Sequence, residues 1–284
     1  MVTAKDLMKT NFVKVDLNNT VSELFGKLRL KKQTFAVVFD GKKYKGMTGR
    51  KWLLTSRIDA AKTKLKNLTK KASKRKTPFY VPKLKPSTDL TEICRLFATA
   101  DTRALPVLEK NELIGVVTAN DVMKAIKSAY KGVPVTEIAS IHTVTINMKS
   151  TTADAIKTMN REKVDRLPVV DRFGKIAGIV TEFDVLKRFH RWPATSRRIS
   201  SDRSHDNWGD LIGSADEKQN LLKQPVKNIM TPYPMVHCAD AHSTVTEVLN
   251  MLVKDNVSSI VLVDNEKPAG ILTVQDIMLD YSRE

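Results

Sequence analysis

Four copies of one short pattern run through the 284 residues, and this repetition constrains the fold more than any other feature. Each copy opens with a residue suited to cap a helix, followed three positions later by an acid: Thr20 and Glu23, Asp89 and Glu92, Thr151 and Asp154, Thr244 and Glu247. The first side chain can accept a hydrogen bond from a free backbone N–H, and the acid lies at the positive end of the helix dipole. Each pattern therefore predicts the start of a helix.

An apolar run follows each predicted helix in the same register. The intervals from Thr20 to Val37, Asp89 to Pro106, Thr151 to Pro168 and Thr244 to Val261 are each 17 residues. Short runs of branched apolar side chains are typical of buried strands. Turn residues and then a glycine follow each run, at Gly46, Gly115, Gly178 and Gly270. This order predicts a hairpin of two strands.

The last three copies also end alike, with glycine, two apolar residues, threonine, two variable residues and aspartate, and then become helical. One copy is therefore a βαββα unit, and the predicted fold class is α+β, with an α/β-like order of elements. Three copies are preceded by a similar short segment, at Lys5–Met8, Thr136–Ala139 and Lys227–Met230. The predicted boundaries are 1–60 for the first repeat, 61–77 for a basic linker, 78–131 for the second repeat, 132–190 for the third, 191–223 for an insertion or linker and 224–284 for the fourth.

The shared ending has two interpretations, and they can hold together. The pairs are Thr118 with Asp121, Thr181 with Asp184, and Thr273 with Asp276. Threonine and aspartate can form a capping box and nothing more. Alternatively, the helix N-terminus attracts an anion while the carboxylate accepts two hydrogen bonds from ribose hydroxyls. The first copy has Gly49 and Trp52 at these positions, so no ribose site is expected there.

These repeats resemble the CBS domain family, named for cystathionine β-synthase, over nearly the whole chain except the basic run and residues 191–223. The resemblance implies that two repeats pack sheet to sheet about a pseudo-twofold axis. The expected arrangement is therefore two tandem pairs, the first repeat with the second and the third with the fourth. A chain with four repeats resembles the γ subunit of AMP-activated protein kinase and stand-alone archaeal four-repeat proteins.

The resemblance also implies ligand sites, because in such proteins the aspartate of the ending holds ribose and the base lies against the partner repeat. It implies Val13 and Thr34–Ala36 beside the base at Asp121, His237 and Ser258–Ser259 near Asp184, and Val144 with Asp165–Arg166 near Asp276. It places basic phosphate ligands at Arg103 and Arg166, although an exposed arginine in a turn is the alternative for each. The implied ligand is AMP, ADP, ATP or S-adenosylmethionine, the last of which needs no phosphate clamp.

Catalysis and metal binding are not expected. The sequence contains no nucleophile elbow, P-loop or zinc-protease motif, so we predict a non-enzyme without a catalytic cofactor. His237, Cys238 and His242 could suggest a metal site, but neighbouring side chains on a strand point to opposite faces. The two cysteines, Cys94 and Cys238, lie in apolar stretches and are expected in the core rather than in a disulfide. The predicted function is a regulatory nucleotide sensor acting through a homodimer or a regulated protein partner.

The formal charge of +17 supports an alternative function. Residues 62–76 contain eight basic side chains and no acid, which fits either a solvated helix or a contact with nucleic-acid phosphates. The alternative is therefore a nucleic-acid-associated protein that uses the repeats as scaffold or switch. This segment contains no aromatic residue for stacking on bases.

The predicted location is the cytoplasm, with no membrane partner. The sequence has neither an apolar run of roughly 18 residues, as a membrane span needs, nor an apolar block near Met1.

Overall fold

The structure is a computed structural model that describes residues 2–31, 33–49, 62–70, 81–100, 102–141, 143–189 and 220–283. The chain divides into two compact units. The first comprises Met1–Ala139, His242–Ile260 and Leu272–Glu284, and the second comprises Ser140–Ala241 and Val261–Ile271.

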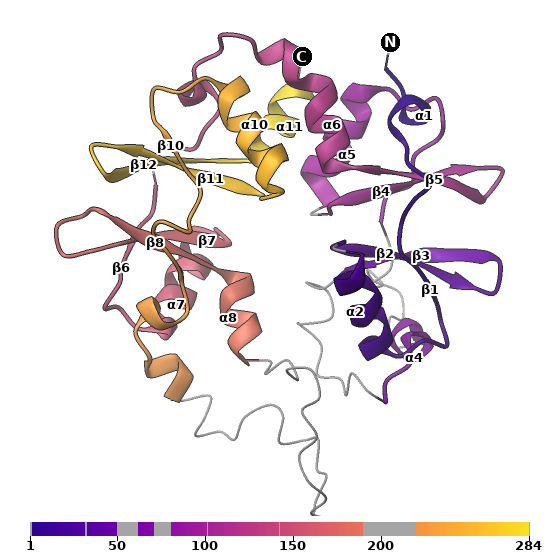
Figure 1. Cartoon of the computed structure of the whole chain (residues 1–284), viewed down its shortest axis with the longest axis horizontal. Coiled ribbons are helices and arrows are strands. Elements are labelled where there is room, and N and C mark those ends of the chain that lie inside the picture. Colours follow the sequence, from indigo (N-terminus) through magenta and orange to yellow (C-terminus); the bar gives the residue numbers. More distant parts are fainter. Residues whose placement is uncertain are drawn as a thin grey trace, which may run out of the picture. The chain divides into compact units, whose positions relative to one another are not determined.

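The first unit holds the first two repeats, the opening segment of the third and two helices of the fourth. Its described elements are α1 (Ala4–Leu7), β1 (Lys14–Asp16), α2 (Val21–Leu30), β2 (Phe35–Asp40), β3 (Lys43–Gly49), α4 (Leu65–Lys70), α5 (Leu90–Ala100), β4 (Ala104–Glu109), β5 (Glu112–Thr118), α6 (Ala119–Ile126), η1 (Lys127–Tyr130), η2 (Val135–Glu137), α10 (Val245–Asp255) and α11 (Val274–Tyr281). Within this unit, the sheet β1–β2–β3 lies across from the strand pair β4–β5 (Figure 1). Helices α2 and α4 lie beyond the first sheet, and α5 and α6 beyond the second.

The second unit holds the third repeat from Ser140 onward and most of the sheet strands of the fourth. Its described elements are β6 (Ile146–Asn147), α7 (Thr152–Glu162), β7 (Arg166–Val170), β8 (Ile176–Thr181), α8 (Glu182–Phe189), η4 (Val226–Asn228), β9 (Thr231–Pro232) and β10 (Cys238–Asp240). Strands β11 (Ser259–Asp264) and β12 (Lys267–Thr273) contribute residues to both units. The strand orders are β6–β7–β8–β9 and β10–β11–β12.

A parallel strand pairing recurs in every repeat with the same register. Lys14, Leu84, Ile146 and Cys238 pair in parallel with Val37, Val107, Val169 and Val261, and the partners are 23 residues apart in each repeat. The hairpins that follow are antiparallel, and those of the first three repeats have a register shift at corresponding positions. The predicted α+β fold with four βαββα repeats is confirmed. The repeat boundaries themselves stay predictions.

All four predicted helix caps are present. The backbone N–H of Glu23, Glu92, Asp154 and Glu247 donates to the cap residue three positions earlier, at 3.2, 2.9, 3.1 and 3.3 Å. These bonds satisfy one of the free N–H groups that every helix start leaves. In each copy, the predicted cap residue therefore accepts the hydrogen bond that the sequence pattern led us to expect.

The three short segments ahead of the repeats add a strand-like contact to another repeat. Lys9, Ser140 and Thr231 form antiparallel bridges with Val116, Ile271 and Ile179. Each of these partners directly follows a glycine of the shared ending. A Cβ at Gly178 would overlap the Thr231 carbonyl, and one at Gly115 would lie 2.8 Å from Met8 Sδ. These glycines are therefore required by the close passage of another chain segment.

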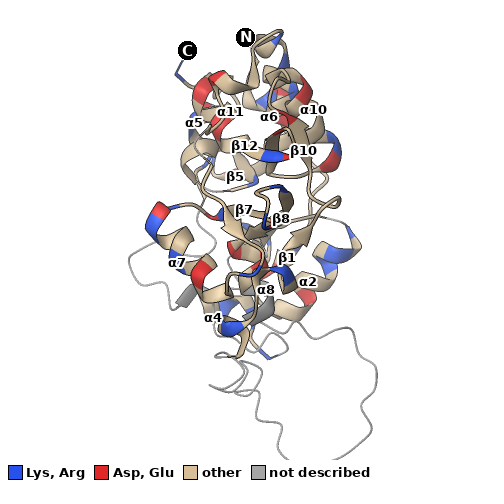
Figure 2. Ribbon diagram, turned by 90° about the vertical axis from the view of Figure 1, so that its left-hand side faces the viewer, with Lys and Arg blue, Asp and Glu red and all other residues tan. Residues whose placement is uncertain are grey.

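The first part of the basic run forms helix α4, which packs against the core of the first repeat. Leu65 of α4 is fully buried with Val21, Leu24 and Leu28 of α2, and Leu68 packs against this cluster. The neighbouring Lys66 is exposed. Helix α4 thus packs Leu65 and Leu68 into the core while Lys66 faces solvent, and Figure 2 shows basic residues on α4 in blue. Residues 71–76 of the run and 190–219 of the predicted insertion lie outside the described residues.

Candidate functional site

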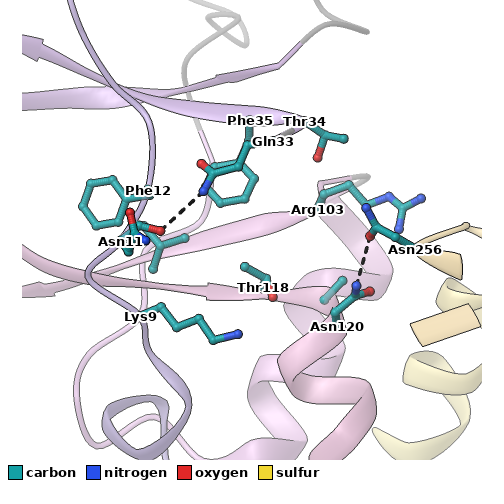
Figure 3. Close-up of a pocket in the computed structure, with 12 residues that line it drawn as sticks. Lys9, Asn11, Phe12, Gln33, Thr34, Phe35, Arg103, Thr118, Asn120 and Asn256 are labelled. Carbon is teal, nitrogen blue, oxygen red and sulfur yellow. Dashed lines mark hydrogen bonds between the residues drawn. The ribbon is translucent and has the colours of Figure 1, made fainter. Parts of the chain in front are cut away.

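A pocket of about 220 Å³ lies in the first unit between the first and second repeats. Figure 3 shows residues at the start of β2 on one side and residues of β5 and α6 on the other. Its lining residues are Lys9, Asn11, Phe12, Gln33, Thr34, Phe35, Arg103, Val116, Thr118, Ala119, Asn120 and Asn256. The pocket therefore combines cationic, amide and aromatic side chains with the first turn of a helix.

Thr118 caps α6 at the pocket. Its Oγ1 accepts a 3.3 Å hydrogen bond from the backbone N–H of Asp121 and donates one of 2.6 Å to Asp121 Oδ2. The other two shared endings form full capping boxes, with Thr181 and Thr273 bonded to Asp184 and Asp276 through both the hydroxyl and the backbone N–H. The capping interpretation is thus confirmed in all three copies. It leaves the ligand interpretation open, because capping occupies one carboxylate oxygen.

The aspartates of the three shared endings differ in the hydrogen-bond partner of their second oxygen, Oδ1. Asp121 is 8% exposed, and its Oδ1 accepts a charged hydrogen bond from Lys9 Nζ. The Lys9 side chain is 58% exposed, so it reaches the carboxylate from the solvent side. In the described part of the chain, Oδ1 of Asp184 and of Asp276 has no hydrogen-bond partner.

Arginine and amide side chains form the rest of the polar lining. Arg103 stands just before β4, and its carbonyl accepts a 3.0 Å bond from Ala119 at the start of α6. Asn120 Nδ2 donates a 3.0 Å bond to Oδ1 of Asn256, the residue that caps the end of α10. Gln33 binds the segment before β1 by accepting a 2.9 Å bond from the backbone N–H of Val13. Thr118 and Arg103, both predicted from the sequence, therefore meet in one pocket.

Val13 lies beside the pocket but in the core. It is 5% exposed and packs among apolar residues of the first repeat, while Asn11 and Phe12 just before it line the pocket. Sequence reasoning missed Lys9 and Asn256. Lys9 directly follows the segment Lys5–Met8, which recurs ahead of two other repeats, so this position could have been singled out from the sequence. Asn256 could not, because it reaches the pocket from a distant repeat.

The predicted residues of the second unit are arranged differently. Arg166 forms a two-point ion pair with Asp165, at 2.7 and 2.8 Å, and its side chain is 13% exposed. Val144 packs against the core of the third repeat. Thr273 and Asp276 belong to the first unit, so their grouping with Val144 and Arg166 stays a prediction.

Metal and membrane features are absent from the described ranges. No group of three or more His, Cys, Asp or Glu side chains there could hold a metal ion. No helix within those ranges is both long and apolar enough to span a bilayer. Trp52, the residue that replaces aspartate in the first copy, lies outside them.

The profile of the CBS domain matches residues 78–128, 135–191 and 226–282. The chain belongs to the CBS domain family. The first CBS repeat lies outside these matches and is identified by the strand register that it shares with the others. The resemblance predicted from the repeats is therefore confirmed.

Relatives of this CBS protein cover different parts of it. An uncharacterized protein of Methanocaldococcus jannaschii is 26% identical over 283 residues, which is 96% of this chain and 60% of that protein. Another from the same organism is 35% identical over 104 residues, which is 37% of this chain and 34% of that protein. The chain thus spans between about a third and three fifths of the length of these curated relatives.

A solved structure shares the fold over the whole chain. It is a M. jannaschii protein described as a proposed archaeal homologue of the AMP-activated protein kinase γ subunit. The TM-score is 0.68 at 18% identity, with 99% of this chain and 100% of that chain covered. This likeness supports the four-repeat CBS fold.

Proposed function

We propose that this CBS protein is a regulatory sensor that binds an adenosine-type nucleotide or S-adenosylmethionine at clefts between repeats, and that it catalyses no reaction. The observation that carries the proposal is the pocket between the first two repeats. A helix start, two cationic side chains and two phenylalanines converge there. Ligand sites are typically concave and place a few polar groups among apolar ones.

Each part of a nucleotide has a suitable partner in this pocket. The start of α6 presents the partial positive charge of the helix dipole, and Arg103 adds a guanidinium that can bind an anion through two hydrogen bonds. Phe12 and Phe35 offer apolar surface for a base. The amides of Gln33 and Asn120 can donate to or accept from a base or a sugar.

We propose the other two sites at Asp184 and Asp276, where one carboxylate oxygen has no hydrogen-bond partner among the described residues. Asp184 and Asp276 each use Oδ2 for capping, which leaves Oδ1 to accept a ribose hydroxyl. The partners of the base and of the anionic group at these two sites stay those that the family resemblance implies. Arg166 would have to exchange its contact with Asp165 for the ligand.

Regulation would follow from the position of the sites between repeats. A ligand that contacts two repeats stabilises the relative placement in which both contacts form. The surface offered to a regulated protein, or to a second copy of the chain, would change accordingly. Differential affinity for two placements is the physical requirement for this effect.

A thermal-shift panel tests the proposal. AMP, ADP, ATP and S-adenosylmethionine are added to the wild type, to Asp184→Ala, to Asp276→Ala and to the double variant. A ligand at a hundred times its Kd should raise the Tm of the wild type by about 5 °C. The shift should be smaller in each single variant and smallest in the double variant.

Asp154→Ala is the matched control, because it removes a capping-box aspartate that belongs to no shared ending. Its ligand-induced shift should equal that of the wild type. The absence of a shift with every adenosyl ligand at millimolar concentration would contradict the proposed function.

Nucleic-acid binding is the second candidate, favoured by the net charge of +17 and by the exposed Lys62, Lys64 and Lys66. It predicts binding of a short RNA that weakens steeply with salt, because phosphate contacts release counterions. Fluorescence anisotropy at two salt concentrations measures this. Neutralising Lys70, Lys71, Lys74, Arg75 and Lys76 should then weaken RNA binding and leave the adenosyl response unchanged.

A further inference from the structure

We propose that Lys9 is the specificity-determining residue of the pocket in the first unit. Lys9 stays paired with the carboxylate of Asp121 when the ligand is neutral. A ligand with an anionic group pairs with Lys9 itself, which frees the carboxylate to bind the ribose. This inference rests on the proposed function, and it assigns the charge that an adenosyl ligand must carry at this pocket.

The first supporting observation is the difference among the three carboxylates. Both oxygens of Asp121 are engaged, Oδ2 by Thr118 Oγ1 and Oδ1 by Lys9 Nζ. The corresponding Oδ1 of Asp184 and of Asp276 has no hydrogen-bond partner among the described residues. Lys9 therefore occupies the acceptor that the two other endings leave open.

The second observation is that Lys9 has direct counterparts in the other repeats. Lys9, Ser140 and Thr231 each bridge to the residue after a strand glycine, and that residue precedes the aspartate of the ending by five positions. The three positions are therefore equivalent in the fold. Two of them carry a short neutral hydroxyl and one carries a long cation, so the difference is local to the first pocket.

The consequence for a neutral ligand follows from the burial of Asp121. Lys9 Nζ already takes one acceptor position of Oδ1, so a ribose that binds this oxygen through two hydroxyls must displace Lys9. The carboxylate, at 8% exposure, would then lose its counter-charge, and a buried charge without a partner is unfavourable. A neutral nucleoside has no anionic group that could pair with the displaced Lys9.

An anionic ligand removes this penalty by exchange. Its phosphate supplies a new partner for Lys9 while its ribose takes the carboxylate, so both charges stay paired. The Lys9 side chain is 58% exposed and flexible, so it can move between the two partners. Arg103 at the far end of the lining adds a second positive charge (Figure 3). A ligand with a sulfonium cation would meet these two cations at an additional cost.

Isothermal titration calorimetry with AMP and adenosine tests the inference on the full chain. Asp184→Asn and Asp276→Asn together form the background, so that the first pocket dominates the signal. In this background AMP should bind at least about tenfold more tightly than adenosine. Adding Lys9→Thr, which copies Thr231 of the fourth repeat, should lower this ratio of Kd values by about fivefold, because adenosine gains affinity and AMP loses it while Arg103 still attracts the phosphate.

Two further variants separate this role from a general effect of charge. Lys9→Arg should keep the preference for AMP. Lys124→Met removes an exposed lysine of α6 outside the pocket and should also keep it. An unchanged ratio of Kd values in Lys9→Thr would overturn the inference and leave the proposed function standing. Failure of both AMP and adenosine to bind the background chain, with wild type also unresponsive, would overturn both; failure in the background alone would overturn the inference for this pocket.

Discussion

The side-chain amide of Asn120 donates a 3.0 Å hydrogen bond to Asn256, and this bond joins the start of α6 to the end of α10. Asn256 caps α10 in the left-handed conformation, with φ at 53°. Both residues line the pocket of the first two repeats. The fourth repeat thus supplies part of that pocket's wall, which no pattern within a single repeat could indicate.

Asn256→Ala should lower the free energy of unfolding by about 1 kcal/mol, because alanine tolerates the left-handed conformation poorly and cannot bond to Asn120. Asn256→Gly should cost less, since glycine adopts this conformation freely and loses only the side-chain bond. Urea unfolding of both variants measures the difference. Equal losses would show that backbone conformation at Asn256 contributes nothing.

Gly178→Ala should destabilise the chain by about 1–3 kcal/mol, because its Cβ would overlap the backbone carbonyl of Thr231. Gly26→Ala is the matched control. A Cβ at Gly26, within α2, would have no neighbour within 4 Å, so alanine should be neutral or stabilise the chain by up to about 1 kcal/mol. Chemical denaturation compares the two, and a stable Gly178→Ala variant would argue against the close passage of β9.

Stability should fall as the pH drops below about 4, through the capping carboxylates. The pKa of Asp154 is lowered, chiefly by the hydroxyl of Thr151 and then by its backbone N–H. The pKa of Glu23 is lowered, chiefly by the backbone N–H of Thr20. A carboxyl with a lowered folded pKa contributes stability above its unfolded pKa and loses it as pH falls through the folded value.

Urea unfolding at about pH 5 and about pH 3 measures this loss. Thr151→Ala should show a smaller loss than the wild type, because it removes the hydroxyl that lowers the pKa of Asp154. An identical pH dependence in the two proteins would contradict the assignment.

The two thiols should react at very different rates. Cys94 of α5 is fully buried, and burial raises its pKa to about 12. Cys238 is half-buried, and burial raises its pKa as well. A thiol reagent at about pH 8 should label Cys238 in the native protein and Cys94 only when the first unit opens. Cys94→Ala assigns the slow phase, and fast labelling of Cys94 would contradict its burial.

The repeats and their caps were predictable because each rests on local chemistry. A threonine followed three residues later by an acid satisfies a helix start wherever it occurs, and Thr151 with Asp154 does so as expected. Branched apolar runs at a constant interval likewise specify strands in register. Thr118 and Arg103 line one pocket, and their role in binding a ligand stays a prediction.

The parts that could not be predicted depend on contacts between distant segments. Lys9 and Asp121 are 112 positions apart, and Asn120 and Asn256 are 136 apart. Neither pair follows from periodicity or capping. The division of the fourth repeat between two units likewise depends on tertiary packing, such as the bond of Tyr130 to the Ile277 carbonyl.

A crystal structure of the full chain grown with saturating AMP tests the central claim most directly. We predict AMP in the pocket between the first two repeats, within hydrogen-bond distance of Thr118 and Arg103, with Lys9 moved from Asp121 to the phosphate. An empty pocket at saturating AMP, or AMP bound away from all of the lining residues, would contradict the account.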